Sequence, residues 1–423
     1  MRYFVPVIII PLYILIIDIY TFKGVMLLIR RRKLLIFRRL VPIVFILTSL
    51  FFIITQIWLF SNPSMASDLD SYPSVFRLLG LLVLVYVPKT VFSLFHFIED
   101  IIWLIFYYYN KIKDKINPSR KRIIIYSRKL GIRFLTNTGA ILSLLLFLAL
   151  LYAMVFGRFN YTVRKEVISF KNLPARFDGL RIVQISDLHF GSMIGNENKF
   201  NKAVKIINSL NADLVVFTGD MVNNYAEEVN GWVSMLSEIK ASFGKFSVLG
   251  NHDYGDYLTW ESELLKKKNL EKLKSYHKKT GFKLLENESY SFRIDSQIIN
   301  IVGVGNWGVP PFPQYGDLQK ALSGTDDSFK ILLSHDPTHW DAQVVNSTDI
   351  ALTLSGHTHG FQFGIDFRKF KWSPVQYLYK QWSGLYNNKD QYLFVNRGTG
   401  YIGFPGRFGV WPEITLIELK TIR

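Results

Sequence analysis

Five short motifs in the second half of the chain carry side chains that can bind metal ions or transfer protons. They contain carboxylates, an amide and five of the chain's eight histidines, while the chain has no cysteine. Oxygen and imidazole donors without thiolate suit manganese, iron or zinc. The motifs are Asp187-Leu188-His189, Gly219-Asp220, Gly250-Asn251-His252-Asp253, His335-Asp336 and Gly356-His357-Thr358-His359-Gly360.

Each motif directly follows a short apolar run that predicts a buried strand. The helical stripe in NENKFNKAVKIINSLN, between the first two runs, predicts a βαβ unit with parallel strands. Ligands collect beyond the carboxyl ends of strands in α/β sheets, so we expect the scattered motifs to converge on one site. The runs are LRIVQIS, DLVVFT, KFSVL, KILLS and IALTLS.

In this order the motifs resemble the calcineurin-like metallophosphoesterase superfamily, whose pattern is D-x-H, GD, GNH followed by Asp or Glu, a lone His, and GH-x-H. No motif position departs from that pattern, and the membrane-tethered arrangement is similar to transmembrane members. The resemblance implies an α/β fold with a two-sheet β-sandwich flanked by helices. It also implies two metal sites with Asp220 bridging them, namely Asp187, His189, Asp220 and His359 at one and Asp220, Asn251, His335 and His357 at the other.

The same resemblance makes His252 the general acid that protonates the departing alkoxide. Two ions roughly 3.5–4 Å apart can share a hydroxide and clamp both oxygens of an in-line displacement. The expected activity is therefore hydrolysis of a phosphoester or pyrophosphate bond. Asp253 either orients a neighbour or caps a turn. Arg397 either grips a phosphate bidentately or pins a turn.

The first third of the chain predicts a membrane domain. Residues 3–20, 40–60 and 139–156 are each long and apolar enough to span a bilayer. Residues 75–109 predict a fourth span as one long kinked helix, interrupted by Pro88 and by charged residues. Two interpretations of the polar residues in this segment are open. Either a polar site in the membrane is formed by Lys89, His96, Glu99 and Asp100, or Lys89 snorkels while the two acids lie at the interface. The expected division is 1–157 for the membrane domain and 158–423 for the phosphoesterase domain.

The formal charge of +17 is unevenly distributed, which argues against nucleic acid as a partner. Residues 1–157 hold 19 Lys/Arg against 6 Asp/Glu, whereas residues 158–423 hold 31 against 27. The loops 23–39 and 110–133 carry seven and nine basic residues, while 61–74 carries none. Positive loops stay in the cytoplasm. Four spans then predict a multi-pass cell (inner) membrane protein whose phosphoesterase domain is extracytoplasmic.

The sequence leaves the substrate open, although the lipid bilayer is an expected partner. Residues 361–386 interleave aromatic and basic residues, which suits either a surface at headgroup level or a core-lining segment with solvated charges. A lipid or lipid-linked phosphate compound is the expected substrate. The alternatives are a UDP-diacylglucosamine pyrophosphatase-like hydrolase, whose substrate is cytoplasmic, and a non-catalytic metal-containing membrane receptor or scaffold. Residues 258–280 predict a basic amphipathic helix with a solvated face.

Overall fold

The computed structural model describes residues 4–31, 35–62, 68–116, 133–367 and 370–422. Close contacts divide the chain into two compact units. We call residues 1–68 and 77–151 the helical unit, and residues 69–76 and 152–423 the sheet unit. The basic residues Arg120, Lys121 and Arg122 lie outside the described residues.

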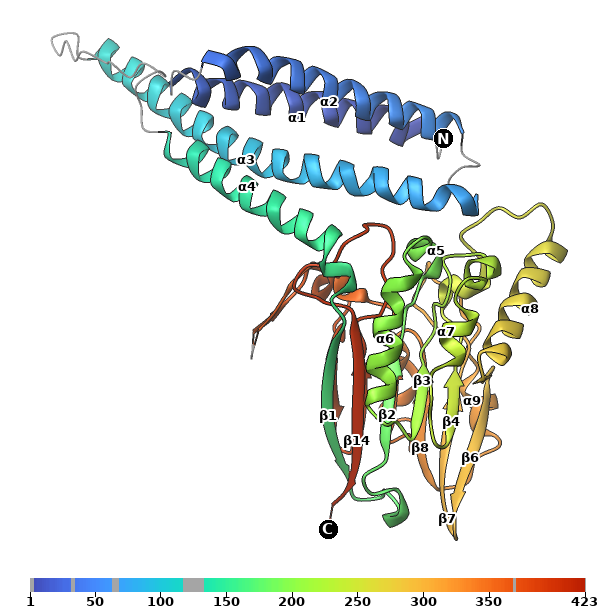
Figure 1. The fold of residues 1–423 in the computed structure, drawn as a ribbon. Coiled ribbons are helices and arrows are strands. Elements are labelled where there is room, and N and C mark those ends of the chain that lie inside the picture. Colours follow the sequence, from blue (N-terminus) through green and yellow to red (C-terminus); the bar gives the residue numbers. More distant parts are fainter. Residues whose placement is uncertain (1–3, 32–34, 63–67, 117–132, 368–369, 423) are drawn as a thin grey trace. The chain divides into compact units, whose positions relative to one another are not determined.

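Four long helices make up the helical unit (Figure 1). Each is long and apolar enough to cross a bilayer, in agreement with the four predicted spans. The prediction of a single helix over 75–109 is confirmed, because the chain continues as one helix through Pro88. The helices are α1 (Phe4–Arg31), α2 (Leu35–Ser61), α3 (Tyr72–Ile116) and α4 (Phe134–Val155).

Several polar side chains of the helical unit pair with side chains of other helices. The Lys89 ammonium lies 2.6 Å from a carboxylate oxygen of Asp18. The other oxygen of Asp18 accepts hydrogen bonds from Tyr86, at 2.7 Å, and Ser49, at 2.5 Å. Lys89 thus forms an ion pair between α3 and α1 instead of snorkelling. Such pairing is what hydrocarbon requires of a charged side chain.

A second polar group joins α3 to α4. His96 Nδ1 and the Thr136 hydroxyl are 2.9 Å apart, and the Thr136 backbone N–H donates to Glu99 at 3.2 Å. The Arg133 guanidinium lies 3.4 Å from Asp100 and 3.8 Å from Glu99. The two acids are therefore held by a helix–helix contact, which supports the packing of the unit.

Two mixed six-stranded sheets form the sheet unit, in the strand orders β1-β14-β2-β3-β4-β5 and β12-β13-β9-β8-β7-β6. The expected two-sheet α/β architecture is confirmed. As the βαβ prediction required, β2 and β3 pair in parallel, and α6 (Glu197–Ser209) connects them in the chain. The strands are β1 (Thr162–Phe170), β2 (Arg181–Ile185), β3 (Leu214–Phe217), β4 (Gly244–Ser247), β5 (Phe282–Leu284), β6 (Glu288–Ile294), β7 (Gln297–Gly303), β8 (Phe329–Leu333), β9 (Leu352–Ser355), β12 (Gly384–Asn388), β13 (Gln391–Val395) and β14 (Glu413–Thr421). A separate hairpin pairs β10 (Ile365–Phe367) with β11 (Phe370–Trp372).

Alternation along the strands explains why the sheets stack. In β3, Leu214 and Val216 point into the core between the two sheets, whereas Val215 and Phe217 point into the core under the helices. Both sets are fully buried, so each β3 side chain contributes to one of two apolar layers. Figure 1 shows α6, α7 and α8 alongside the sheet that contains β2, β3 and β4. The helices are α5 (Phe190–Met193), α6 (Glu197–Ser209), α7 (Val233–Ser237), α8 (Glu263–Lys279) and α9 (Leu318–Leu322).

Candidate metal centre

The predicted site residues come from the ends of five strands, which belong to both sheets. Beyond β2 lie Asp187 and His189, and beyond β3 lies Asp220. The 3₁₀ turn after β4 carries Asn251 and His252. The second sheet supplies the rest, with His335 beyond β8 and His357 and His359 beyond β9. The structure brings all eight predicted residues together where the two sheets meet.

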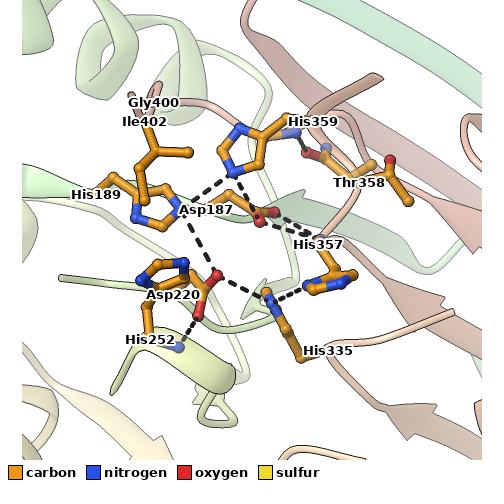
Figure 2. A network of polar contacts seen from close by, with 12 residues as sticks. Asp187, His189, Asp220, His252, His335, His357, Thr358, His359, Gly400 and Ile402 are labelled. Carbon is orange, nitrogen blue, oxygen red and sulfur yellow. Dashed lines mark hydrogen bonds and ion pairs between the residues drawn. The ribbon is translucent and has the colours of Figure 1, made fainter. Parts of the chain in front are cut away.

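Two groups of three side chains are each arranged so that one cation can touch all three. Asp187, His189 and His359 form the first triad, and Asp220, His335 and His357 form the second. Within the first, His359 Nε2 lies 3.3 Å from Asp187 Oδ1 and 3.0 Å from His189 Nε2. Figure 2 shows these imidazoles and carboxylates pointing toward a common centre.

Asp220 lies within reach of both triads. Its Oδ2 is 3.1 Å from His335 Nε2 in its own triad and 3.6 Å from His189 Nε2 in the other. Asn251 Oδ1 is 3.1 Å from the same nitrogen of His335. The positions of Asp220 and Asn251 therefore fit the bridging and second-site roles expected of them.

The spacing of the donor atoms fits a metal ion. Metal–nitrogen and metal–oxygen bonds of about 2.1 Å place neighbouring ligand atoms about 3.0–3.4 Å apart in octahedral or tetrahedral geometry. The distances from His335 Nε2 to Asp220 and to Asn251 Oδ1, both 3.1 Å, lie in this range. His357 Nδ1 lies 3.3 Å from His335 Nε2. Imidazole nitrogens this close, facing carboxylates, form a site suited to a cation.

Three of the histidines use their other ring nitrogen to contact an oxygen atom. His189 Nδ1 lies 3.1 Å from the Asn223 side-chain oxygen. His335 Nδ1 lies 2.7 Å from the Thr218 carbonyl, and His357 Nε2 lies 2.8 Å from the Tyr379 hydroxyl. A hydrogen bond at one nitrogen fixes the ring and leaves the opposite lone pair for a metal.

Charge in the site is balanced between acids and histidines. Burial alone would lower the pKa of His335, but the carboxylates of Asp220 and Asp187 raise it to about 10. Burial likewise opposes ionisation of Asp220, yet His335 and His252 hold the pKa of that carboxyl well below its usual value. A proton on His335 thus offsets part of the negative charge of the two carboxylates, and a bound cation would take its place.

His252 lies beside the triads with its ring orientation fixed. Its Nδ1 lies 2.9 Å from the Asn223 carbonyl oxygen, which can only accept, so this nitrogen donates the hydrogen bond. The ring meets His189 edge to face, with centroids 4.9 Å apart. Burial lowers the pKa of His252, against the opposing field of Asp220. This leaves Nε2 as the ring nitrogen that can exchange a proton with a bound molecule.

Backbone strain is concentrated at the proposed ligands. Five of them have φ between 48° and 72°, a left-handed conformation that non-glycine residues rarely adopt. Glycines next to them allow a close approach, since a Cβ on Gly250 would lie 2.3 Å from Asp220 Oδ1. The five strained residues are Asp187, His189, Asp220, His357 and His359.

Several supporting residues escaped the sequence analysis. Asn223 contacts both His189 and His252, and the buried Glu228 accepts hydrogen bonds from the backbone of residues 191 and 223–225. Asp253, whose role the sequence left open, accepts the backbone N–H groups of Gly250 and residues 220–222. Asp253 thus orients the loop that carries Asp220. The only sequence signals for this support were the acidic residue after His252 and the asparagine pair after Gly219-Asp220.

Two buried arginines lie near this region. Arg397 donates to Glu413 at 2.5 Å and to Asp366 at 2.6 Å, which favours the interpretation that it pins a turn. Arg407 is fully buried, and its Nη2 lies 3.0 Å from His359 Nδ1. The sequence analysis had not singled out Arg407, because nothing in its local pattern distinguishes it from a surface arginine.

A cavity of about 340 Å³ opens over the site. Its walls away from the proposed ligands are largely apolar. Beyond the metal-binding side chains and His252, the lining consists of Phe312, Thr358, Phe361, Gln362, Tyr379, Ile402 and Phe404.

Comparison with known proteins agrees with this geometry. Residues 1–158 match a family described as a probable calcineurin-like phosphoesterase transmembrane domain, and residues 180–361 match the calcineurin-like phosphoesterase family. The chain is 33% identical over 268 residues to the uncharacterised metallophosphoesterase YkuE of Bacillus subtilis, covering 62% of this chain and 85% of that protein. It is 32% identical over 278 residues to a zebrafish (Danio rerio) transmembrane protein with metallophosphoesterase domain. That match covers 63% of this chain and 60% of the zebrafish protein, so it spans well under two thirds of the relative's length.

The two matching families agree with the two triads at the strand ends and with the four apolar helices that precede them. The chain therefore belongs to the calcineurin-like metallophosphoesterases, as a member with an N-terminal transmembrane domain.

Proposed function

We propose that the protein hydrolyses a phosphoester or pyrophosphate bond of a lipid or lipid-linked substrate at a membrane surface. The observation that carries the hydrolytic part is the pair of triads within reach of the shared Asp220, with His252 beside them. A site built only for binding has no need of an oriented imidazole next to its ligands. The position of His252 therefore favours an enzyme over a receptor or scaffold.

Each group has a distinct task in this proposal. Asp187, His189, Asp220 and His359 would hold one ion, and Asp220, Asn251, His335 and His357 the other. When bound, the two ions supply an activated hydroxide and positive charge against the phosphoryl oxygens. His252 gives its Nε2 proton to the departing oxygen, while its Nδ1–H stays on the Asn223 carbonyl.

The lipid part rests on two observations. The chain has four helices able to span a bilayer, so its substrate site is tethered to a membrane. The segment 361–386 of the sheet unit also leaves large apolar side chains in water, including Tyr377 at 76% and Leu378 at 71% exposure. Trp382 and Val375 of the same segment are buried, so part of it serves the core. Its exposed part supports contact with lipid headgroups and upper acyl chains.

The expected side of the membrane is extracytoplasmic. With α3 as a single helix, the number of candidate spans is even, which supports the same side of the membrane for the sheet unit and the N-terminus. The basic loops 23–39 and 110–133 would then lie in the cytoplasm. Outer-leaflet lipids and extracytoplasmic lipid phosphates fit this arrangement, whereas a cytoplasmic sugar nucleotide does not.

Turnover by the purified full-length chain tests the proposal. A panel of phospholipids and lipid diphosphates is incubated in detergent with added manganese, and the released phosphate compounds are measured. We expect hydrolysis of at least one lipid by the native protein and none above background by His335→Ala. Equal turnover by the two proteins, or no turnover of any phosphate compound, would contradict the assignment.

A further inference from the structure

The walls of the site cavity differ in chemistry from its floor, which the proposed metal ligands form. Phe312 meets His357 edge to face, with ring centroids 4.8 Å apart and planes at 89°. Phe361, Ile402 and Phe404 line the same cavity. A phosphate held on the floor would therefore have apolar side chains beside it.

Two of the three polar side chains in these walls are held by backbone groups, and the third, Tyr379, has its hydroxyl 2.8 Å from His357 Nε2. The Thr358 hydroxyl donates to the Trp382 carbonyl at 2.8 Å. The Gln362 amide nitrogen donates to the carbonyls of Ile402 and Phe404, at 3.1 and 2.9 Å, and its oxygen accepts the Ile402 N–H at 2.7 Å. Gln362 thus fixes the loop that supplies two apolar wall residues, and its own donors are used.

Cationic side chains are absent from the lining of this cavity, as far as the described residues define it. Arg397 is held by Glu413 and Asp366. Arg407 directs its three nitrogens to His359 and to the carbonyls of Gly400 and Val410. Neither arginine belongs to the lining of the cavity.

This chemistry distinguishes classes of phosphate ester. A phosphodiester has two non-bridging oxygens and one negative charge, so the floor can take up both oxygens. A monoester or terminal phosphate has a third non-bridging oxygen and a second charge. Among the described lining residues no cationic side chain meets that second charge, and removing an uncompensated charge from water is costly.

We infer that the site selects phosphodiesters that carry an apolar group, and that this group lies against Phe361, Ile402 and Phe404. This inference rests on the proposed function. In such a diester an alkoxy group takes the place of the third non-bridging oxygen, and its carbon chain meets the apolar wall. Hydrolysis adds water across one P–O bond, giving a phosphomonoester and an alcohol that receives its proton from His252. The product's new charge then meets the same apolar wall, which favours its release.

Binding of two compounds that cannot be hydrolysed tests this inference. Dibutylphosphinate carries one charge and two oxygens, whereas butylphosphonate carries two charges and three oxygens at sufficiently high pH. Calorimetric titration of the manganese-loaded full-length protein should show the phosphinate binding about tenfold more tightly or better, because the second charge of the phosphonate meets no cationic wall residue. Equal or tighter binding of the phosphonate would overturn the inference.

A gained charge gives a second, independent readout. Phe361 is 48% exposed, so an arginine can extend from this position without disturbing a core. Phe361→Arg should strengthen phosphonate binding several-fold relative to phosphinate binding, and Phe361→Gln, which is neutral, should not. If both variants change the ratio alike, charge is not what the wall selects against.

Turnover separates this inference from the proposed function. The native protein should hydrolyse bis(p-nitrophenyl) phosphate in preference to p-nitrophenyl phosphate. Preference for the monoester, together with tighter phosphonate binding, would leave the phosphoesterase assignment intact and refute diester selection. Absence of turnover of both esters would count against the proposed function itself, whatever the order of binding.

Discussion

Replacing His252 by alanine tests the part of the mechanism that depends on proton donation. The ring is held by one hydrogen bond, from Nδ1 to the Asn223 carbonyl at 2.9 Å, and none of the proposed metal contacts involves it. The alanine variant should therefore keep its metal. It should lose the protonation of the leaving oxygen, and with it the rate on substrates whose alkoxide departs poorly.

The size of the expected rate loss in His252→Ala follows from how well the ring is oriented. A positioned general acid contributes about 10²–10⁴-fold, or about 3–5 kcal/mol of barrier. His252 is fixed both by the carbonyl and by its edge-to-face contact with His189, so we expect a loss in the upper half of that range, about 10³–10⁴-fold. For p-nitrophenyl esters, whose leaving group needs little protonation, the loss should stay below about tenfold.

The assay compares rates on an alkyl ester and a p-nitrophenyl ester of the same class, with metal content measured on the same samples. His252→Gln serves as the control, because an amide can donate a hydrogen bond but cannot give up a proton near neutral pH. It should be as slow as the alanine variant on the alkyl ester. Equal losses on both esters, or a glutamine variant close to native, would refute the assignment of His252 as the acid.

Three further predictions concern support, stability and sidedness. Asn223→Ala removes the acceptor of the His189 N–H and should weaken metal binding about 10–100-fold in chelator competition, whereas Asn223→Asp should retain most of it. Burial lowers the pKa of His277 to about 3, so its unfolded form, with a pKa of about 6.5, takes up a proton first as the pH falls. The native protein and the His277→Gln variant are compared without metal. As the pH falls from about 6.5 to about 3, the native protein should lose about 1.4 kcal/mol of unfolding free energy per pH unit that the variant does not lose. Identical pH profiles of thermal unfolding would contradict this. Ser262→Cys, in a chain without cysteine, should react with a membrane-impermeant maleimide in intact cells, or in spheroplasts, and labelling only after lysis would place the sheet unit in the cytoplasm.

The strand-end motifs were predictable because short, local patterns encode them. Each proposed ligand follows an apolar run, and the carboxyl ends of parallel strands meet at one edge, so convergence of Asp187 and Asp220 follows from β2 and β3 being parallel neighbours. The four membrane helices were predictable for a similar reason, since length and apolar composition suffice.

The supporting contacts were not predictable because they join residues far apart in the chain. Arg407 reaches His359 from 48 residues away, and Lys89 meets Asp18 from 71 residues away. The left-handed backbone at His357 and His359 accompanies contacts with distant residues, from the His357 N–H to Asp187 and from the Thr358 hydroxyl to the Trp382 carbonyl. Sequence patterns identified the elements, while tertiary packing decided which polar groups pair.

The central claim is that two metal ions lie within reach of one shared carboxylate, and elemental analysis of the purified full-length chain tests it most directly. Native protein should contain close to two transition-metal ions per chain, and Asp220→Asn should lose a large part of both. Asp295→Asn, which alters an exposed carboxylate with a side chain 61% accessible, should match the native metal content. Native protein with no bound transition metal after manganese loading, or Asp220→Asn with a full complement of two ions, would contradict the account.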